Sequence, residues 1–223
     1  MIYFVSDIHL GAGSREQAQR TERAFCRWLD MVAADATHLY LLGDIFDFWF
    51  EYRRVAPKGF VRVLGRLAEL TDRGVRVTLY TGNHDMWCYD YFERECGIEV
   101  VKSPRVECIA GKKLHLAHGD NMNIRGNLLL RLMNATFRSR VARWLFSWLV
   151  HPDLSLKFGH WWSGKSRKSH GAEPIAADRL DFLVDYARQH HNESGDVAAY
   201  IFGQMHLAHR HTEASGLDVL FMS

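Results

Sequence analysis

The stretch VRVTLYTGNHD, residues 75–85, joins a predicted buried strand to a group of chemically active residues. Apolar and β-branched residues from Val75 to Tyr80 are typical of a short strand inside a sheet. Directly after it the chain reads Gly82-Asn83-His84-Asp85. Amides, imidazoles and carboxylates are the side chains that bind metal ions and transfer protons. The stretch therefore predicts a strand whose carboxyl end carries part of a reactive site.

Four other short apolar runs end in the same way. Together with the first they predict five strands: Ile2–Val5, Leu39–Leu42, Val75–Tyr80, Leu114–Ala117 and Ala198–Phe202. The segments after them read SDIH from residue 6, GD from 43, GNHD from 82, HGD from 118 and GQMH from 203. In an open α/β sheet the carboxyl ends of neighbouring strands meet at one crevice. We therefore expect the five segments to form a single site.

Helical patterns separate several of these strands. Ser14 and Gln17 form a capping-box signature before an apolar helical face. Pro57 predicts the start of a second helix and Gly74 its end, and a third helical pattern covers about residues 175–190. Strands that alternate with helices predict an α/β layer fold. Residues 106–117 and the final LDVLF look like antiparallel additions to it.

The five segments contain the ligands that hard divalent ions such as Mn²⁺ take. Asp7 and His9 are two residues apart and would share a face in a regular strand. Asp44 can bridge two ions through its two oxygens. Neutral ligands come from one amide and two imidazoles: Asn83, His118 and His206. Two ions roughly 3.5–4 Å apart can activate a water and stabilise charge on a phosphoryl group. His84 could then assist the leaving oxygen, with Asp85 orienting it.

In this order, the motifs DIH, GD, GNHD, HGD and G-x-x-H resemble the calcineurin-like metallophosphoesterase family. The match runs from Asp7 to His206, and the combination is specific although each element alone is weak. The resemblance implies a sandwich of two sheets flanked by helices. It also implies a first ion held by Asp7, His9, Asp44 and His206, and a second held by Asp44, Asn83 and His118. His84 would be the catalytic histidine.

One position departs from the family pattern. Where the family has G-H-x-H, this chain has Gly203-Gln204-Met205-His206. Gln204 can coordinate a metal through its carbonyl oxygen, but it is a weaker and harder ligand than imidazole. The substitution leaves three outcomes open: lower occupancy of the second ion, a different preferred metal, or a site with one ion.

Within the family, GDIFDFWFEY and GNHDMW are similar to UDP-2,3-diacylglucosamine hydrolases. That resemblance implies Mn²⁺-dependent cleavage of a pyrophosphate by water. The products would be UMP and 2,3-diacylglucosamine 1-phosphate, a lipid A precursor. Those enzymes carry a helical cap after HGD, and residues 123–169 stand at that place in a single domain of 223 residues. Their Asp and Tyr after HGD correspond to Gly126 and Leu129 here, which leaves the exact substrate open.

The expected cap differs in composition from the rest of the chain. Residues 125–168 hold nine Lys or Arg, one acid and four of the seven tryptophans. VARWLFSWLV could bury acyl chains, although an aromatic stripe is also typical of an ordinary helix–helix core. We expect Lys165, Arg167 and Lys168 to pair with the pyrophosphate or with anionic lipid headgroups; the alternative is a solvated face. Tryptophans also favour a peripheral contact with a membrane.

The bulk composition indicates a cytoplasmic enzyme associated with the inner membrane. No apolar run reaches the roughly 18 residues of a membrane-spanning helix. We find no signal-peptide pattern, and the four cysteines form no disulfide framework. The final apolar strand suggests truncation at the C-terminus. Alternatives to the lipid substrate are another phosphodiester, phospholipid or nucleotide, and a binding protein weakened by Gln204. Nucleic-acid binding by the basic cap is a weaker alternative.

Overall fold

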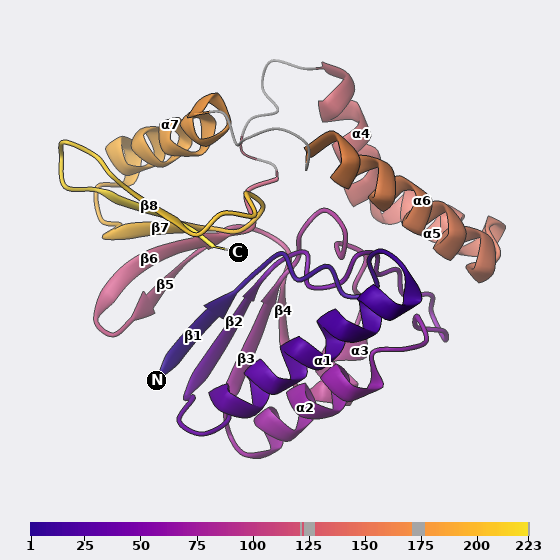
Figure 1. The fold of residues 1–223 in the computed structure, drawn as a ribbon. Helices are drawn as coiled ribbons and strands as arrows, with labels where there is room; N and C mark the ends of the chain where they lie inside the picture. Colours follow the sequence, from indigo (N-terminus) through magenta and orange to yellow (C-terminus); the bar gives the residue numbers. More distant parts are fainter. Residues whose placement is uncertain (121, 123–127, 171–176, 223) are drawn as a thin grey trace.

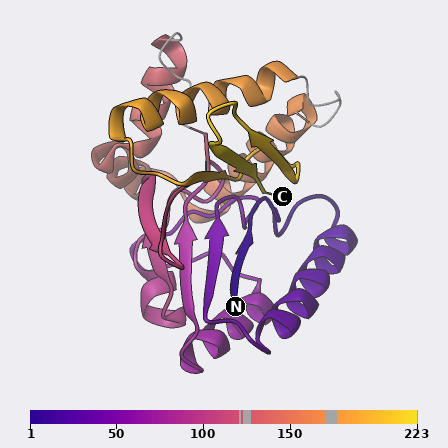
Figure 2. The same ribbon diagram turned by 90° about the vertical axis from the view of Figure 1, so that its left-hand side faces the viewer.

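The computed structural model describes residues 1–120, 122, 128–170 and 177–222 (Figure 1). It is a sandwich of two sheets with helices on its outer faces, which confirms the expected fold class. Three further helices lie beyond the ends of the strands. The two views in Figures 1 and 2 show that these helices stand over the side of the sandwich where the strands of the first sheet end.

The first sheet is entirely parallel, in the order β1-β2-β3-β4. Its strands are Ile2–Val5, His38–Leu42, Arg76–Tyr80 and Glu99–Val101. Helices α1, α2 and α3 cover its outer face and span Arg15–Val32, Val61–Asp72 and Tyr91–Cys96 (Figure 1). Parallel strands need crossover connections, and these helices provide them. The three strands predicted in this half of the chain are confirmed to within one residue.

The helix boundaries follow local capping chemistry, with one exception. The Ser14 hydroxyl accepts from the Gln17 N–H and the Gln17 side chain accepts from the Ser14 N–H, so the predicted capping box is present. The second helix does not begin at Pro57 as predicted. It begins after Phe60, which has a left-handed backbone and no side-chain cap. Gly74, with φ of 86°, follows its end as expected.

The second sheet is mixed, in the order β5-β6-β7-β9-β8. Its strands, in chain order, are Arg105–Ile109, Lys112–Ala117, Ala199–Phe202, His209–Thr212 and Asp218–Phe221. Helix α7, Ala177–Ser194, covers its outer face (Figure 2). β5 is antiparallel to β6 as expected. The prediction for the last strand was partly wrong, because β9 is antiparallel to β8 but parallel to β7. His209 and His211 lie in β8, where a loop would be the ordinary expectation for polar residues beyond the GQMH segment.

Apolar side chains fill the three spaces between these layers. The largest cluster lies between the first sheet and its helices and includes the fully buried Trp49 and Phe92. A second cluster joins the other sheet to α7. The third lies between the two sheets and includes Tyr40, Tyr80 and Ile201. Burial on both sides makes the strands rigid supports for the loops at their carboxyl ends.

Helices α4, α5 and α6 follow β6 and span Leu128–Arg138, Arg140–Leu149 and Pro152–His170. They contact the main body at several points. The Tyr52 hydroxyl donates to the Val150 carbonyl over 3.0 Å, and the rings of Phe50 and Phe146 lie 5.1 Å apart. Trp144, Trp148 and Trp161 are more than half exposed, so these three side chains are not a helix–helix core. None of the helices described has the length and apolar character needed to cross a membrane.

Candidate metal centre

The five predicted segments meet at one place, as expected from the sequence. The loop after β7 reaches the loop after β1, since Gln204 N donates to Asp7 Oδ2 over 2.9 Å. The loop after β6 reaches β2, since His118 Nδ1 donates to the Leu42 carbonyl over 2.9 Å. These two bonds join the two sheets at their carboxyl ends. The second bond also places the proton of a neutral His118 ring on Nδ1, which leaves Nε2 as the atom that can bind a metal ion.

Asp44 lies at the centre of the site and is 2% exposed. Its Oδ2 atom faces one ring nitrogen from each of three histidines, at 3.3 Å from His118 Nε2, 3.8 Å from His84 Nε2 and 3.9 Å from His9 Nε2. Its Oδ1 atom accepts a hydrogen bond of 2.9 Å from the backbone N–H of His84. One oxygen is thus fixed by the backbone, and the other is directed at the imidazoles.

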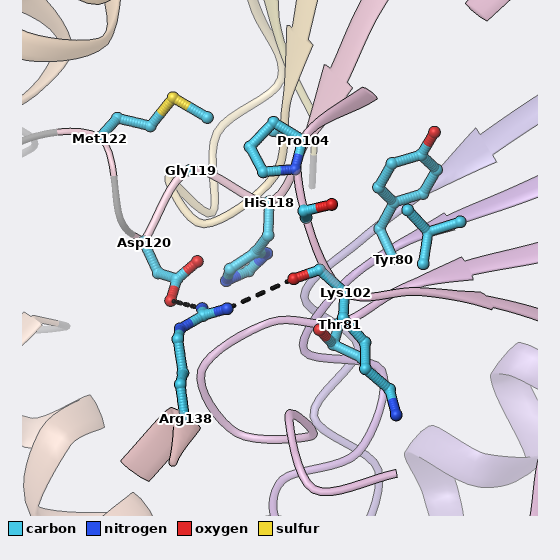
Figure 3. A pocket seen from close by; sticks show the side chains of 12 residues that line it. Tyr80, Thr81, Lys102, Pro104, His118, Gly119, Asp120, Met122 and Arg138 are labelled. Carbon is cyan, nitrogen blue, oxygen red and sulfur yellow. Dashed lines mark hydrogen bonds and ion pairs between the residues drawn. The ribbon is translucent and has the colours of Figure 1, made fainter. Parts of the chain in front are cut away.

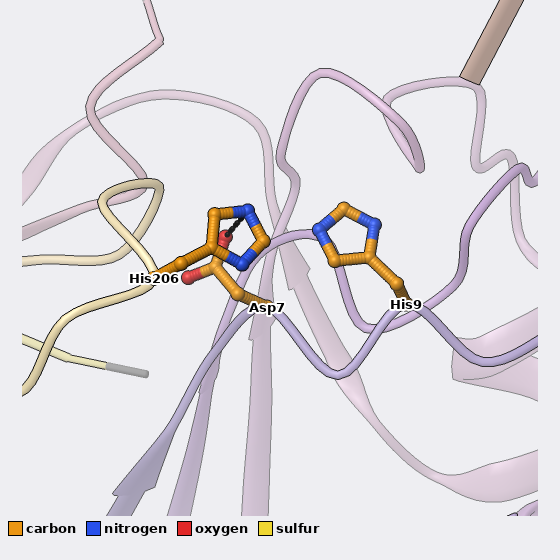
Figure 4. A group of neighbouring side chains, drawn as sticks. All are labelled: Asp7, His9 and His206. Carbon is orange, nitrogen blue, oxygen red and sulfur yellow. Dashed lines mark ion pairs between the residues drawn. The ribbon is translucent and has the colours of Figure 1, made fainter. Parts of the chain in front are cut away.

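Asp7, His9 and His206 form a second group next to Asp44 (Figure 4). His206 Nε2 lies 3.7 Å from Asp7 Oδ1, and the rings of His9 and His206 stack with centroids 4.9 Å apart. The side chain of His206 is 48% exposed, whereas that of Asp7 is 0% exposed. The group is therefore open to solvent on the side of His206, where a substrate can approach.

Five of the candidate ligands have a left-handed backbone, with φ between 48° and 63°: Asp7, His9, Asp44, Gln204 and His206. Residues other than glycine adopt this conformation rarely, and it costs about 1–2 kcal/mol per residue. Strained residues of this kind gather at functional sites. They also explain why Asp7 and His9 meet: both lie beyond the end of β1, so a turn and not a regular strand brings them together.

Asp85 anchors the loops behind this cluster. Its buried carboxylate accepts backbone N–H bonds from Gly82 at 2.7 Å and Ile45 at 2.8 Å, and longer ones from Asp44 and Phe46. Asp85 was expected to orient the ring of His84, but its hydrogen bonds go to these backbone groups. The carboxylate therefore fixes the turn after β3 against the turn after β2, which positions the backbone of both Asp44 and His84.

Other groups orient the His84 ring. His84 Nδ1 lies 2.8 Å from the carbonyl oxygen of Asp47 and also contacts the Ser163 hydroxyl. A carbonyl can only accept, so Nδ1 carries the proton and Nε2 faces Asp44. Ser163 comes from α6 and is 1% exposed. Sequence reasoning assigned no role to Asp47 or Ser163. The second aspartate of GDIFD was the only signal that could have indicated one of them.

Burial and the charges of the cluster shift several pKa values, in opposing directions. Burial alone raises the pKa of Asp44, but the neighbouring imidazoles outweigh it and hold that pKa well below its usual range. Burial and the charge of Asp44 raise the pKa of Asp7, against the opposing effect of His118. Burial lowers the pKa values of His84 and His206. Despite its burial, His118 has a raised pKa because Asp44 and Asp7 face it, so its ring holds a cation's charge until a metal ion replaces the proton. Two carboxylates that attract positive charge in one buried site are a cation-binding arrangement.

The unsatisfied polar atoms of the site fit a metal ion. Among the residues that the structure describes, Asp7 Oδ1, His118 Nε2 and Gln204 Oε1 are buried and form no hydrogen bond. Buried polar atoms normally have partners, so atoms without one indicate a missing ligand. Three sets of side chains bring ligand atoms within 4.8 Å of one another: Asp7, His9 and His206; His9, Asp44 and His84; Asp7, Asp44 and His118.

The structure brings the carboxylate and imidazole ligands together but leaves other expectations untested. Asn83 is half-buried in the turn between Gly82 and His84. The predicted phosphate-binding residues Lys165, Arg167 and Lys168 lie in α6, but their side chains are outside the described part of the chain, as is Gly126.

A small pocket opens beside His118, between the turn after β6 and the loop after β4 (Figure 3). Arg138, the last residue of α4, forms one of its walls. Its guanidinium donates to Asp120 Oδ2 over 2.8 Å and to the Lys102 carbonyl over 3.4 Å. This ion pair attaches α4 to the HGD turn that carries His118. The pocket therefore connects the candidate metal centre with the helices above it.

A two-sheet sandwich with this cluster at its strand ends defines a metal-dependent phosphoesterase. The family model for calcineurin-like phosphoesterases matches residues 1–208, and the chain belongs to that family. Members of the family use divalent metal ions, and the three ligand sets described above are where this chain can hold them.

Three relatives in this comparison share one name. A UDP-2,3-diacylglucosamine hydrolase of Porphyromonas gingivalis is 38% identical over 92% of this chain and 83% of its own length. A UDP-2,3-diacylglucosamine hydrolase of Pseudomonas fluorescens is 31% identical over 92% of this chain and 78% of its own length. A third, from Ralstonia nicotianae, is 27% identical over 96% of this chain and 80% of its own length.

Proposed function

We propose that this protein hydrolyses the pyrophosphate of a UDP-linked diacylglucosamine and releases UMP and 2,3-diacylglucosamine 1-phosphate. The observation that carries the proposal is the 38% identity, over 92% of the chain, with a hydrolase named for that substrate. The cluster around Asp44 supports the same chemistry, because the pyrophosphate linkage is an anionic phosphoanhydride and the site gathers groups that bind cations.

In this proposal Asp7, His9, Asp44 and His206 hold one divalent ion, with Mn²⁺ the expected metal. Asp44, Asn83, His118 and Gln204 hold a second. Asp7 also lies within reach of this second position, since Asp7, Asp44 and His118 form one of the three ligand sets. Such ions supply an activated water and stabilise the charge that develops on phosphorus. Asp44, like Asp7 and His9, lies in two of the three sets, and it is proposed as the bridge because its Oδ2 faces His9 Nε2 as well as His118 Nε2.

His84 is proposed to serve the leaving oxygen. Its Nδ1–H is fixed by the Asp47 carbonyl, so Nε2 is the atom turned to the site. Burial lowers the pKa of His84, so Nε2 is unprotonated in the resting site and would first accept a proton, which the attacking water can supply, before passing it to the leaving oxygen. Asp85 is proposed to act through the backbone, by holding the turns of Asp44 and His84 in place.

We further propose that residues 123–169 act as a cap within the single domain. The exposed apolar side chains on α4, α5 and α6 support a role in acyl-chain or membrane contact, with Trp148 and Leu149 more than three quarters exposed. Tryptophan and arginine together are typical of an interface with anionic lipid. Lys165, Arg167 and Lys168 are proposed to meet the pyrophosphate or lipid headgroups. The protein would then act at the cytoplasmic face of the inner membrane.

The hydrolase proposal is tested with UDP-2,3-diacylglucosamine and Mn²⁺, by measuring UMP. Wild-type protein should release UMP, and Asp44→Ala should not, because it removes a ligand from both positions. Equal UMP in the two preparations would show that the reaction does not use this site. Hydrolysis of a simple aryl phosphodiester without any UMP from the lipid would instead assign the site to another substrate.

Membrane contact is tested separately by flotation with vesicles that contain anionic lipid. Trp148→Ser should reduce the bound fraction severalfold. Met31→Ser is the matched control, because Met31 is 66% exposed on α1, away from the proposed cap. Equal loss of binding in the two variants would contradict a specific role for α5.

A further inference from the structure

The two ends of the metal centre offer different kinds of ligand atom. The set at the solvent side contains two imidazoles and one carboxylate, from His9, His206 and Asp7. The set at the inner side contains one imidazole and two carboxylates, from His118, Asp44 and Asp7. Because Asp44 is proposed as a ligand of both ions, the difference between the two ends is the number of imidazoles, two at the outer end and one at the inner end.

Gln204 adds a further oxygen on the inner side. Its Oε1 lies next to Gly119, the residue after His118, at 3.4 Å from the place where a Cβ on that glycine would be. Within the described part of the chain this oxygen is buried and accepts no hydrogen bond. An unpaired buried amide oxygen is costly, so this oxygen beside the HGD turn is available to bind a ligand.

The backbone holds Gln204 firmly in this position. Its φ of 63° is left-handed, and its N–H donates to Asp7 Oδ2 over 2.9 Å. Gly203 N in turn donates to the Ala117 carbonyl, at the end of the strand that leads to His118. Gln204 is thus connected to both carboxyl-end loops that form the inner set. Its side chain starts from a fixed point and not from a free loop.

We infer that the inner position, around His118 and Gln204, selects a hard divalent ion such as Mg²⁺ or Mn²⁺ and binds it more weakly than the outer position at His9 and His206. The inference rests on the proposed role of these residues as metal ligands, but not on the identity of the substrate. The two ions then bind in sequence, the outer first. Occupancy of the inner position then depends on the free concentration of the hard metal ion.

The physical reason is the preference of each ligand type. Imidazole nitrogen suits Zn²⁺ and related ions, whereas carboxylate and carbonyl oxygens suit Mg²⁺ and Mn²⁺. An amide oxygen in place of an imidazole lowers the affinity of the position for ions that prefer nitrogen. It lowers the affinity less for ions that prefer oxygen. We expect the two dissociation constants for Mn²⁺ to differ by about tenfold or more. Zn²⁺ should show a larger difference than Mn²⁺.

The test is titration of the metal-free full-length chain with Mn²⁺, following free ion by electron paramagnetic resonance and heat by calorimetry. No substrate is present, so the result is independent of the hydrolase proposal. Wild-type protein should bind two ions per chain in two separate steps. The same titration with Zn²⁺ should give a strong first step and a much weaker second one.

Two substitutions assign the weaker step to Gln204. Gln204→His should tighten the second step about tenfold or more for Zn²⁺ and by a smaller factor for Mn²⁺. Gln204→Glu keeps the size of the side chain, adds a charge and should tighten the second step for Mn²⁺. His206→Gln is the matched control at the outer position and should weaken the first step. Circular dichroism confirms that each variant is folded.

Three results would overturn the inference. Wild-type protein could bind two Mn²⁺ ions with one common affinity, or bind only one ion. Alternatively, Gln204→His and Gln204→Glu could both leave the second step unchanged. UMP release without two binding steps would contradict this inference alone. Two binding steps without UMP release would contradict the proposed substrate and would leave the inference unaffected.

Discussion

Gly82→Ala is the substitution with the most specific expected consequence. A Cβ at residue 82 would lie 2.1 Å from Asp44 Oδ1 and 2.6 Å from Asp44 N. Real Cβ atoms essentially never approach another heavy atom within 3.0 Å, so the carboxylate oxygen must retreat by about 0.9 Å. That oxygen accepts a hydrogen bond from the His84 N–H, and the backbone N–H of Asp44 itself donates to the Asp85 carboxylate. Moving this oxygen therefore costs its hydrogen bond to the His84 N–H.

A displacement of about 1 Å in a catalytic group typically costs about 10²-fold in rate. We expect Gly82→Ala to lower kcat/KM for UMP release by roughly that factor, equivalent to about 2.7 kcal/mol of transition-state stabilisation. Metal affinity should fall with it, because moving Oδ1 also turns Oδ2 of the same carboxylate away from the imidazoles that it faces. The assay is steady-state kinetics over a range of Mn²⁺ concentrations, with metal binding measured in parallel.

Gly65→Ala is the matched control. Gly65 lies in α2 with an ordinary helical φ, and a Cβ there would meet nothing within 4 Å. Activity should be unchanged, and stability should rise by up to about 1 kcal/mol because alanine favours the helix. Activity of Gly82→Ala within twofold of wild type, with normal metal affinity, would refute the placement of Asp44 in the site.

Three further substitutions test the rest of the structure. His84→Gln should lower kcat by about 10²–10⁴-fold in the same assay, and near-normal kcat would exclude a role in proton transfer. His115 is buried, and burial with the nearby His190 lowers its pKa from 6.5 to about 4. The unfolded chain therefore takes up the proton first, and stability should fall by about 3 kcal/mol as pH drops from 6.5 to 4. His115→Phe should lose this part of the acid sensitivity in urea titrations, and an unchanged pH profile would contradict it. Gly159→Ala places a Cβ 2.3 Å from the ring of Phe48, so α6 must shift. Urea unfolding should show a loss of about 1–3 kcal/mol, and no loss would mean that the contact is loose.

Much of the fold could be predicted because the parallel strands are short apolar runs with polar ends. That pattern identified β1, β2, β3, β6 and β7. β4 and β8 were not identified, since Glu99–Val101 has only three residues and His209–Thr212 is polar at every position. Propensity does not select such strands; pairing with a neighbour does. The start of α2 was misplaced at Pro57 because the actual boundary depends on the backbone of Phe60.

The ligands could be predicted one by one, but their supports could not. Asp7, His9 and Asp44 follow predicted strands and belong to recognisable motifs. Asp85 was expected to support the His84 ring and is instead bonded to backbone N–H groups. The ring is held by a backbone carbonyl at residue 47 and by Ser163 from a helix more than 70 residues away in sequence. Contacts with a main-chain oxygen or across such a separation leave no local pattern in the sequence.

The left-handed residues of the metal centre bear on how far the protein can be stabilised. Five such residues at about 1–2 kcal/mol each amount to roughly 5–10 kcal/mol, comparable with the net stability of an ordinary domain. Glycine at any of these positions would relieve the strain but remove a side chain of the centre. A search for thermostable variants should therefore return glycine or asparagine at residues 7, 9, 44, 204 and 206, and those gains should come with loss of metal binding. These five positions are where selection for a stable fold and selection for a working site oppose each other.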